Sequence, residues 1–283
     1  MIFLKPNNFL QTFFQFLINM FFRLNISLKK KIGSYPVNNT FISGDFFQSL
    51  VNSNKESKII FTSLNNFPQK KDYEKFKRKN WIFHNSDEVF DLKKKKRLDF
   101  FKPRKCFSQN LIITKKNYNF LPIGLENRKF YNHGNTDDFY QLRKINLKKL
   151  SKVLYGFNIT NRNRIKVRDC LKKINICEET KGWNSYFYRR ILMRYMFLAC
   201  PEGNGVDTHR MWEALYLRTV PIMERNKISN FLIKANLTII VLNKWSDLSK
   251  FNENKLKKIY LSKKNLFNNK YLFQNYWRNL IRK

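Results

Sequence analysis

The chain of 283 residues is poor in the residues that mark several protein classes, with 8 glycines, 7 prolines and 4 cysteines. Collagen-like and low-complexity chains need far more Gly and Pro, and a small disulfide scaffold needs a denser set of cysteines. The cysteines form no C-x-x-C pair and have no histidine at zinc-finger spacing, which argues against structural zinc and dithiol redox chemistry. No apolar run approaches the roughly 18 residues of a membrane-spanning helix. The composition therefore indicates a globular protein.

Acidic residues are also scarce. The chain has 20 Asp and Glu against 56 Lys and Arg, which gives a formal net charge of +36. Such an excess favours a polyanionic partner, which could be nucleic acid, an anionic membrane or an acidic glycan. The lysines are dispersed along the chain, however, so a general compositional bias explains the charge equally well. No RNP-like, KH or zinc-finger signature accompanies it, and nucleic-acid binding is therefore the second hypothesis.

Residues 9–26 are rich in Phe, Leu and Ile and are followed by a basic run, Lys29–Lys31. Four polar residues interrupt them at intervals of four: Gln11, Gln15, Asn19 and Arg23. This spacing places the polar side chains on one stripe of a helix. Residues 1–35 are therefore predicted to form an amphipathic helix with a basic flank, which packs on its own domain or attaches residues 9–31 to an anionic membrane surface. With no clear signal or anchor, we expect a cytoplasmic protein that is peripheral at a membrane.

Short β-rich runs alternate with helix-length segments along the rest of the chain, a pattern typical of α/β proteins with largely parallel sheets. The strands are expected at 39–42, 58–62, 81–84, 108–114, 153–159, 196–199, 220–223 and 237–242. The helices between them are expected at 73–79, 162–173, 184–194 and 207–217. A polar, turn-rich stretch near 124–150 suggests a boundary between two α/β halves, 36–150 and 151–283. The C-terminal helix is expected to pack back across the first half.

The segment 197–223 carries the strongest chemical signal. An apolar strand ends at Cys200, a loop containing Gly203 and Gly205 follows, and Asp207 fits the N-cap of a helix that runs to about Arg218. A strand, a glycine-containing loop and a helix N-terminus form a suitable site for a phosphate, because free N–H groups and the helix dipole point toward it. An ordinary amphipathic helix with a solvated face would show the same local pattern.

Helical spacing places three functional side chains of this segment on one face. His209 and Glu213 are separated by four residues, and Arg210 and Glu213 by three. Arg210 is suited to bidentate contact with a phosphate, and Glu213 is suited to accept hydrogen bonds from ribose hydroxyls. These residues are the first candidates for a nucleotide-binding site.

The stretch CPEGNGVDTHRMWEALYLRTVPIM resembles the donor-site motif of exostosin-like glycosyltransferases, a pattern of roughly P-x-G-x-G-x-D-x-x-R-x-W-E-A-L followed by G-x-x-P. The matching positions are Pro201, Gly203, Gly205, Asp207, Arg210, Trp212 to Leu215 and Pro221. The segments HNSD at 84–87, LPIGLEN at 121–127 and LYGFNITNR at 154–162 are similar to further family segments in the same order, and the resemblance covers about residues 80–245. Arg218 stands where the family has Gly, which puts the choice of donor in doubt.

This resemblance implies two facing Rossmann-like domains of the GT-B type. The second would hold a nucleotide-sugar, UDP-linked in our expectation, and the first a glycan or glycolipid acceptor. The implied donor contacts are Asn204, Gly205, Asp207, His209, Arg210, Glu213, Asn158 and Arg162, with Arg164 as a helper. The chain has no D-x-D triplet, so no metal and no cofactor beyond the donor are expected. Positive side chains and the helix dipole would then stabilise the departing diphosphate.

An inverting transfer also needs a general base, which a first-half strand end could supply. Asp45, His84 and Asp87 are the candidates, although each also fits a turn or capping role. Two alternatives to a transferase stay open at this point. The chain could be a basic nucleic-acid-binding protein, or a glycosyltransferase relative that binds its ligand without transferring a sugar.

Overall fold

The computed structural model describes residues 13, 17, 20, 41–51, 58–130, 133–180 and 184–283. The amphipathic helix predicted within residues 1–35 lies almost wholly outside this part. Its three described residues, Phe13, Leu17 and Met20, are helical. Among the described residues, no helix has the length and apolar character needed to cross a membrane.

The first half is built on a four-stranded parallel sheet in the order β1-β2-β3-β4. Its strands are β1 (Ile59–Thr62), β2 (Asn80–Phe83), β3 (Lys105–Ser108) and β4 (Tyr118–Phe120). The connections carry η1 (Lys70–Asp72), α3 (Tyr73–Phe76) and α4 (Leu92–Asp99). Trp81, Phe83 and Phe107 are fully buried, as expected for a parallel sheet covered on both faces.

The second half is built on a five-stranded parallel sheet in the order β6-β5-β7-β8-β9. Its strands are β5 (Leu150–Tyr155), β6 (Cys177–Glu179), β7 (Tyr195–Ala199), β8 (Val220–Glu224) and β9 (Ile240–Leu242). The connecting helices are α6 (Arg162–Leu171), α7 (Ser185–Leu192), α8 (His209–Tyr216) and α9 (Ser229–Lys234). Strand β6, which follows β5 in the chain, lies on one side of β5, and β7 lies on its other side. The strand order therefore reverses between β5 and β7. Ligands of open α/β sheets bind at such a switch point, outside the carboxyl ends of the strands.

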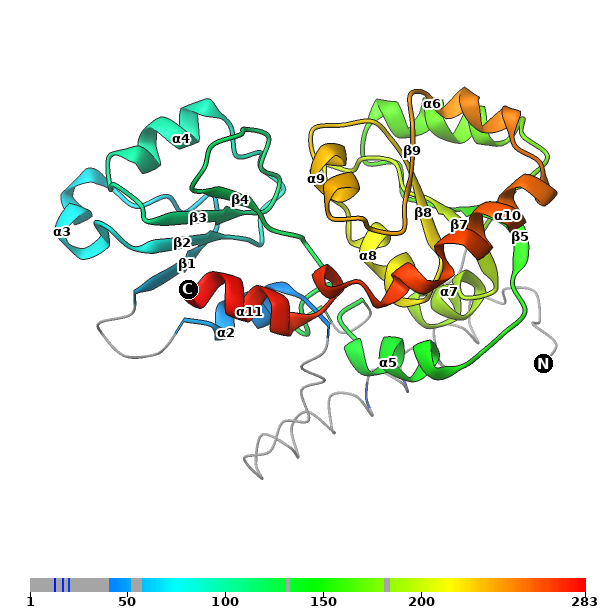
Figure 1. Ribbon diagram of the computed structural model, residues 1–283, viewed down its shortest axis with the longest axis horizontal. Coiled ribbons are helices and arrows are strands. Elements are labelled where there is room, and N and C mark those ends of the chain that lie inside the picture. The colour runs from blue at the N-terminus through cyan, green and yellow to red at the C-terminus, as the bar shows by residue number, and fades with distance from the viewer. Residues whose placement is uncertain are drawn as a thin grey trace.

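The predicted α/β class is confirmed: the chain forms two parallel sheets flanked by helices in a Rossmann-like two-domain arrangement (Figure 1). Two predicted strands are wrong in detail. The strand expected at 108–114 ends at Ser108, where left-handed backbone at Asn110 (φ 52°) turns the chain away. Residues 39 and 40 of the strand expected at 39–42 lie outside the described part, and Phe41 and Ser43 form only isolated bridges before α2 (Gly44–Ser49).

The two sheets are joined through α5 (Thr136–Lys144), and the chain ends in η2 (Trp245–Lys250), α10 (Glu253–Lys263), η3 (Lys264–Asn268), η4 (Lys270–Leu272) and α11 (Gln274–Arg282). Helix α11 lies beside α2 below the first sheet (Figure 1). The Asn80 amide donates to the carbonyl of Ile281 (3.2 Å), and the rings of Phe47 and Trp277 are 6.3 Å apart. The predicted return of the C-terminal helix to the first half is therefore confirmed.

Gly124 makes a close backbone contact where the loop after β4 meets the start of α2. Its φ is +68°, and a Cβ there would lie 2.4 Å from the carbonyl oxygen of Ile42. That oxygen accepts a hydrogen bond from the N–H of Leu125 (2.9 Å). Only glycine satisfies both the backbone conformation and the space.

We predict that Gly124→Ala lowers the free energy of unfolding by about 1–3 kcal/mol, because it adds backbone strain and a steric clash. Urea unfolding followed by circular dichroism measures the change. Gly203→Ala is the matched control: its φ is not in the left-handed region, and its Cβ would meet Arg164 Nη2 at 3.1 Å, so a smaller loss is expected. Equal midpoints for Gly124→Ala and the unsubstituted chain would contradict the prediction.

Candidate functional site

A cavity of about 690 Å³ opens at the switch point between β5 and β7, within the range of small-molecule sites. It is lined by both halves and is called the cleft below. From the second half it takes the loop 156–160 after β5, the loop 203–208 after β7 and the first turn of α8. From the first half it takes Asp87, Ile123, Glu126 and His133. The site therefore lies where the fold places ligands of parallel sheets.

Asp207 ties the two halves together at the base of the cleft. Its buried carboxylate accepts hydrogen bonds from the backbone N–H of Ile123 (2.8 Å) and from Trp212 Nε1 (2.9 Å). Its own N–H donates to Asn110 Oδ1 (3.0 Å). The predicted N-cap role of Asp207 is wrong, because the N-cap of α8 is Thr208. Burial raises the pKa of Asp207 to about 6, although both N–H donors favour the carboxylate.

The loops after β5 and β7 are fastened to each other by the start of α6. The buried guanidinium of Arg164 donates to the carbonyls of Asn158 (2.9 Å), Glu202 (2.8 Å) and Pro201 (3.4 Å). The side-chain amide of Asn161 donates to the carbonyl of Gly203 (2.9 Å). These bonds fix the backbone that lines the second-half side of the cleft.

Besides Arg189, which is paired with Asp138 (2.5 Å), three arginines line this side of the cleft: Arg164, Arg168 and Arg210. Arg210 lies over the ring of Tyr188 (5.2 Å to its centroid) and donates to its hydroxyl (2.5 Å). The buried Nε of Arg168 has no hydrogen-bond partner among the described residues. Burial and the nearby charge of Arg210 lower the pKa of Arg164. Together with the N-terminus of α8, these side chains form a site suited to an anion.

Most of the predicted donor contacts are together in the cleft. His209, Arg210 and Glu213 line it from one face of α8, as their spacing predicted, and Asn158, Asn204, Gly205 and Asp207 also line it. Arg162 is exposed and does not belong to the lining. The arginine of α6 that reaches the cleft from this first turn is Arg164, which helical spacing alone did not distinguish from Arg162.

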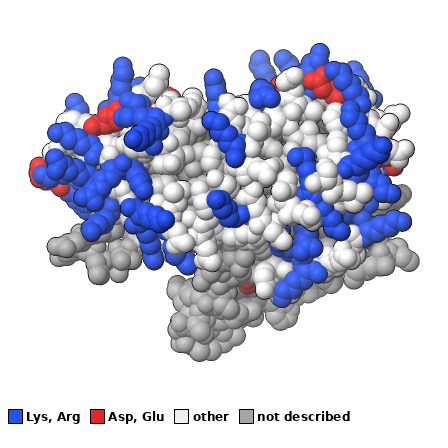
Figure 2. Space-filling view, in the orientation of Figure 1, with Lys and Arg blue, Asp and Glu red and all other residues white. Residues whose placement is uncertain are grey.

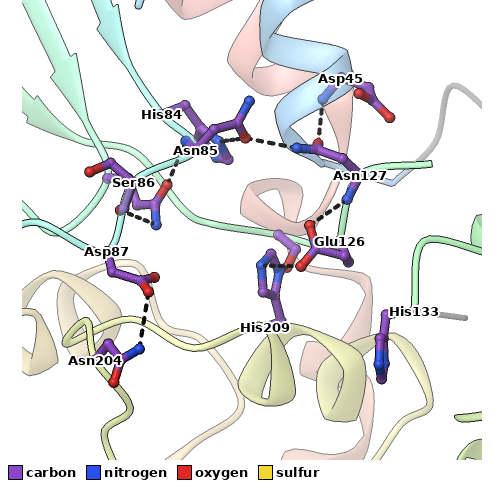
Figure 3. A network of polar contacts seen from close by, with 12 residues as sticks. Asp45, His84, Asn85, Ser86, Asp87, Glu126, Asn127, His133, Asn204 and His209 are labelled. Atoms are coloured by element: carbon purple, nitrogen blue, oxygen red, sulfur yellow. Dashed lines mark hydrogen bonds and ion pairs between the residues drawn. The ribbon is translucent and has the colours of Figure 1, made fainter. Parts of the chain in front are cut away.

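Of the three predicted bases, the structure brings one to the cleft. Asp87 lines it and accepts a hydrogen bond from the Asn204 amide (3.3 Å) (Figure 3). His84 is buried behind the lining, with Nδ1 2.9 Å from Asn85 Oδ1 and Nε2 3.2 Å from the Pro122 carbonyl. Burial lowers the pKa of His84 to about 4, which keeps it neutral.

Asp45 also lies outside the lining. Its carboxylate accepts the backbone N–H of Arg128 (2.8 Å), and its own N–H donates to Asn127 Oδ1 (2.9 Å). The Asn127 amide in turn donates to Asn85 Oδ1 (2.9 Å) (Figure 3). The structure thus places Asp45 in a network that holds the loop 121–128 against α2.

Sequence reasoning missed a pair of side chains that meet across the cleft. His209 Nε2 lies 3.3 Å from Glu126 Oε2, and His209 Nδ1 lies 2.8 Å from the carbonyl oxygen of Gly124 (Figure 3). A carbonyl oxygen only accepts hydrogen bonds, so Nδ1 carries a hydrogen. Nε2 then faces the Glu126 carboxylate across the cleft. The cleft therefore holds a histidine and a carboxylate in direct contact.

The sequence contains little that would predict the contact between Glu126 and His209. Glu126 belongs to the segment LPIGLEN, but its partner is more than eighty positions away.

His133 also lines the cleft, with its Nδ1 2.9 Å from Ser185 Oγ. No cluster of three or more His, Cys, Asp or Glu side chains suited to a metal ion is found in the described ranges. In comparisons with known proteins, no family model matches the chain and no curated protein matches it.

The raised pKa of Asp207 predicts a specific pH dependence of stability. The folded value of about 6 lies above the ordinary value of 3.8, so the stabilisation is full below pH 3.8 and is lost as the pH rises through 6. We expect the stability advantage of the unsubstituted chain over Asp207→Asn to shrink by up to about 3 kcal/mol between pH 4 and pH 7. Denaturant unfolding of both proteins across this range measures it. An advantage that grows with pH would contradict the prediction.

Proposed function

We propose that the chain is a glycosyltransferase of the GT-B type that binds a nucleotide-sugar in the cleft, without a metal ion. The observation that carries the proposal is the convergence of Arg164, Arg168 and Arg210 with the N-terminus of α8 at the switch point. Most of the lining of the second half falls in the two stretches that resemble exostosin-like glycosyltransferases. An anionic ligand with a sugar on one side and a nucleoside on the other fits this arrangement.

The diphosphate would lie against the loop 203–208 and the first turn of α8, where the helix dipole and the arginines act together. Glu213, one turn further along α8, would accept hydrogen bonds from ribose hydroxyls. The loop 156–160, which includes Asn158, would border the nucleoside. We take UDP as the first candidate for the nucleotide.

The acceptor, a glycan or glycolipid in this proposal, would enter from the first half, beside Asp87 and Glu126. A base takes the proton of the acceptor hydroxyl as its oxygen forms a bond to the anomeric carbon. The bond from that carbon to the diphosphate breaks, and the nucleoside diphosphate leaves with the electron pair. Glu126, supported by His209, is our first candidate for the base, and Asp87 the second. The arginines would stabilise the charge that develops on the leaving diphosphate.

Binding is tested by thermal unfolding with UDP, GDP and CMP and with sugars linked to them. A ligand at about one hundred times its Kd adds roughly 2.7 kcal/mol, which is a shift of several degrees for a chain of this size. We expect one nucleotide class to give this shift, and Arg210→Ala and Glu213→Ala to lose it. Arg162→Ala, a matched change of an exposed arginine outside the cleft, should keep it. No shift with any nucleotide would rule out the proposal.

The role of Glu126 is tested with the donor that gives the shift, by measuring release of the nucleoside diphosphate. Glu126→Gln should lower kcat by about 10²- to 10⁴-fold, the usual contribution of a general base, and leave the thermal shift unchanged. Asp87→Asn serves as the comparison. If Glu126→Gln keeps its rate and Asp87→Asn loses it, the base is Asp87.

A further inference from the structure

A second cavity, of about 440 Å³, lies at the opposite end of α8 from the cleft. The cleft borders the first turn of α8 at His209, whereas this cavity borders its last turn at Leu217. The two share no lining residue. The cavity, called the basic pocket below, is bounded by the segment 142–149 after α5, by Met193 at the end of α7 and by the end of α10 with η3.

Four cationic side chains line the basic pocket, and no Asp or Glu does: they are Arg143, Lys149, Arg218 and Lys264. Burial and the nearby charge of Arg218 lower the pKa values of Arg143 and Lys149. Residues 1–40 contain no Asp or Glu, and the only acidic residue outside the described part is Glu56. Outside the described part, only Glu56 could therefore bring an acidic side chain to this cluster.

Two of the four cations already have protein partners. Arg143 donates to the carbonyls of Tyr216 (2.7 Å) and Phe267 (2.6 Å), and Lys149 to the carbonyl of Leu217 (3.1 Å) and to Thr219 Oγ1 (3.1 Å). They donate hydrogen bonds to the carbonyls at the end of α8, and their charge interacts favourably with the helix dipole there. Burial and the charge of Arg218 lower the pKa of Lys149 to about 7, so Arg143 is the main positive charge behind the pocket at neutral pH.

The other two cations have no such explanation. Arg218 and Lys264 are exposed, and within the described ranges neither side chain has a hydrogen bond or an ion pair. Arg218 also has a φ of +55°, in the left-handed region that disfavours side chains other than those of Gly, Asn and Asp. An arginine there adds both backbone strain and like-charge repulsion, which a glycine would avoid. Arg78 and Lys102 share this backbone conformation, so the charge of Arg218 and Lys264, unpaired among the described residues, and not the backbone of Arg218, is the reason to look for a ligand.

We propose that the basic pocket binds the phosphate group of a small phosphorylated molecule. Arg218 and Lys264 contact the phosphate, and Arg143 adds positive charge behind it, joined by Lys149 when that side chain is protonated. Leu142, Ile145 and Phe267, which also line the pocket, receive the organic part of the ligand. The volume exceeds the need of a lone phosphate and falls within the range of small-ligand sites. This site is independent of the proposed transferase activity.

The surface around the pocket agrees with an anionic ligand. In Figure 2, Lys and Arg side chains are spread over most of this face, including the region where Figure 1 shows α5 and the neighbouring part of α10, and acidic side chains are few. Such a surface attracts anions before they bind.

The proposal is tested by thermal unfolding in glycerol 3-phosphate, with glycerol and with sodium chloride at equal ionic strength as control solutions. The phosphate ester should raise the melting temperature by several degrees more than either control solution does. Arg218→Gly should lose this shift and should also melt higher than the unsubstituted chain in the absence of ligand, because it removes strain and repulsion. Arg218→Lys keeps the charge and should keep most of the shift, and Lys264→Gln should lose much of it.

Two control variants separate the basic pocket from other anion sites. Arg210→Ala alters only the cleft and should keep the shift. Arg225→Gln removes an exposed arginine beyond the other end of β8 and should also keep it. A shift that persists in Arg218→Gly would overturn the proposal. So would a melting temperature of the unsubstituted chain that is no higher in glycerol 3-phosphate than in sodium chloride.

A last comparison identifies the source of the phosphate. Flotation with vesicles of phosphatidylglycerol, against phosphatidylcholine, is measured for the unsubstituted chain and for Arg218→Gly. Binding to phosphatidylglycerol that depends on Arg218 supports the pocket as a lipid-headgroup site. Equal flotation of the two proteins, together with a glycerol 3-phosphate shift that depends on Arg218, supports a free phosphorylated molecule.

Discussion

The buried carboxylate of Asp207 is the interaction on which the arrangement of the two halves depends most directly. It joins the loop after β4, through the N–H of Ile123, to α8, through the indole of Trp212. A carboxylate at this depth is costly, as its raised pKa shows, and the two N–H donors offset only part of the cost. Because the loop at 121–128 also carries Glu126, this link and the contact of His209 Nδ1 with the Gly124 carbonyl together set the distance between Glu126 and His209 across the cleft.

The charge of the second half is organised around the two ends of α8. At its N-terminus, four arginines and the first turn of the helix surround the cleft. At its C-terminus, Arg143 and Lys149 bind the carbonyls that end the helix, while Arg218 and Lys264 leave positive charge unpaired within the described residues. The net charge of +36 therefore includes local clusters with defined geometry, whatever the origin of the dispersed lysines.

The sequence predicted the features that depend on local pattern. Short apolar runs located most strands, and helical spacing placed His209, Arg210 and Glu213 on the face of α8 that lines the cleft. Features that depend on contacts distant in sequence were not predicted. Asp207 was predicted as an N-cap because it precedes a helix. Its bond to Ile123 could not be foreseen, because the two residues are 84 positions apart. The choice between Arg162 and Arg164 depends on where α6 begins, which Asn161 sets by capping the N–H of Arg164.

The central claim is that the cleft binds a nucleoside diphosphate, and hydrogen–deuterium exchange with UDP and GDP tests it most directly. The account predicts that one of the two slows exchange at the amides of 203–210, at the loop and first turn of α8, and at 156–160 after β5. Segments remote from the cleft, such as α3 and α4, should exchange at unchanged rates. Exchange that stays the same throughout 156–160 and 203–210 with both nucleotides would contradict the claim.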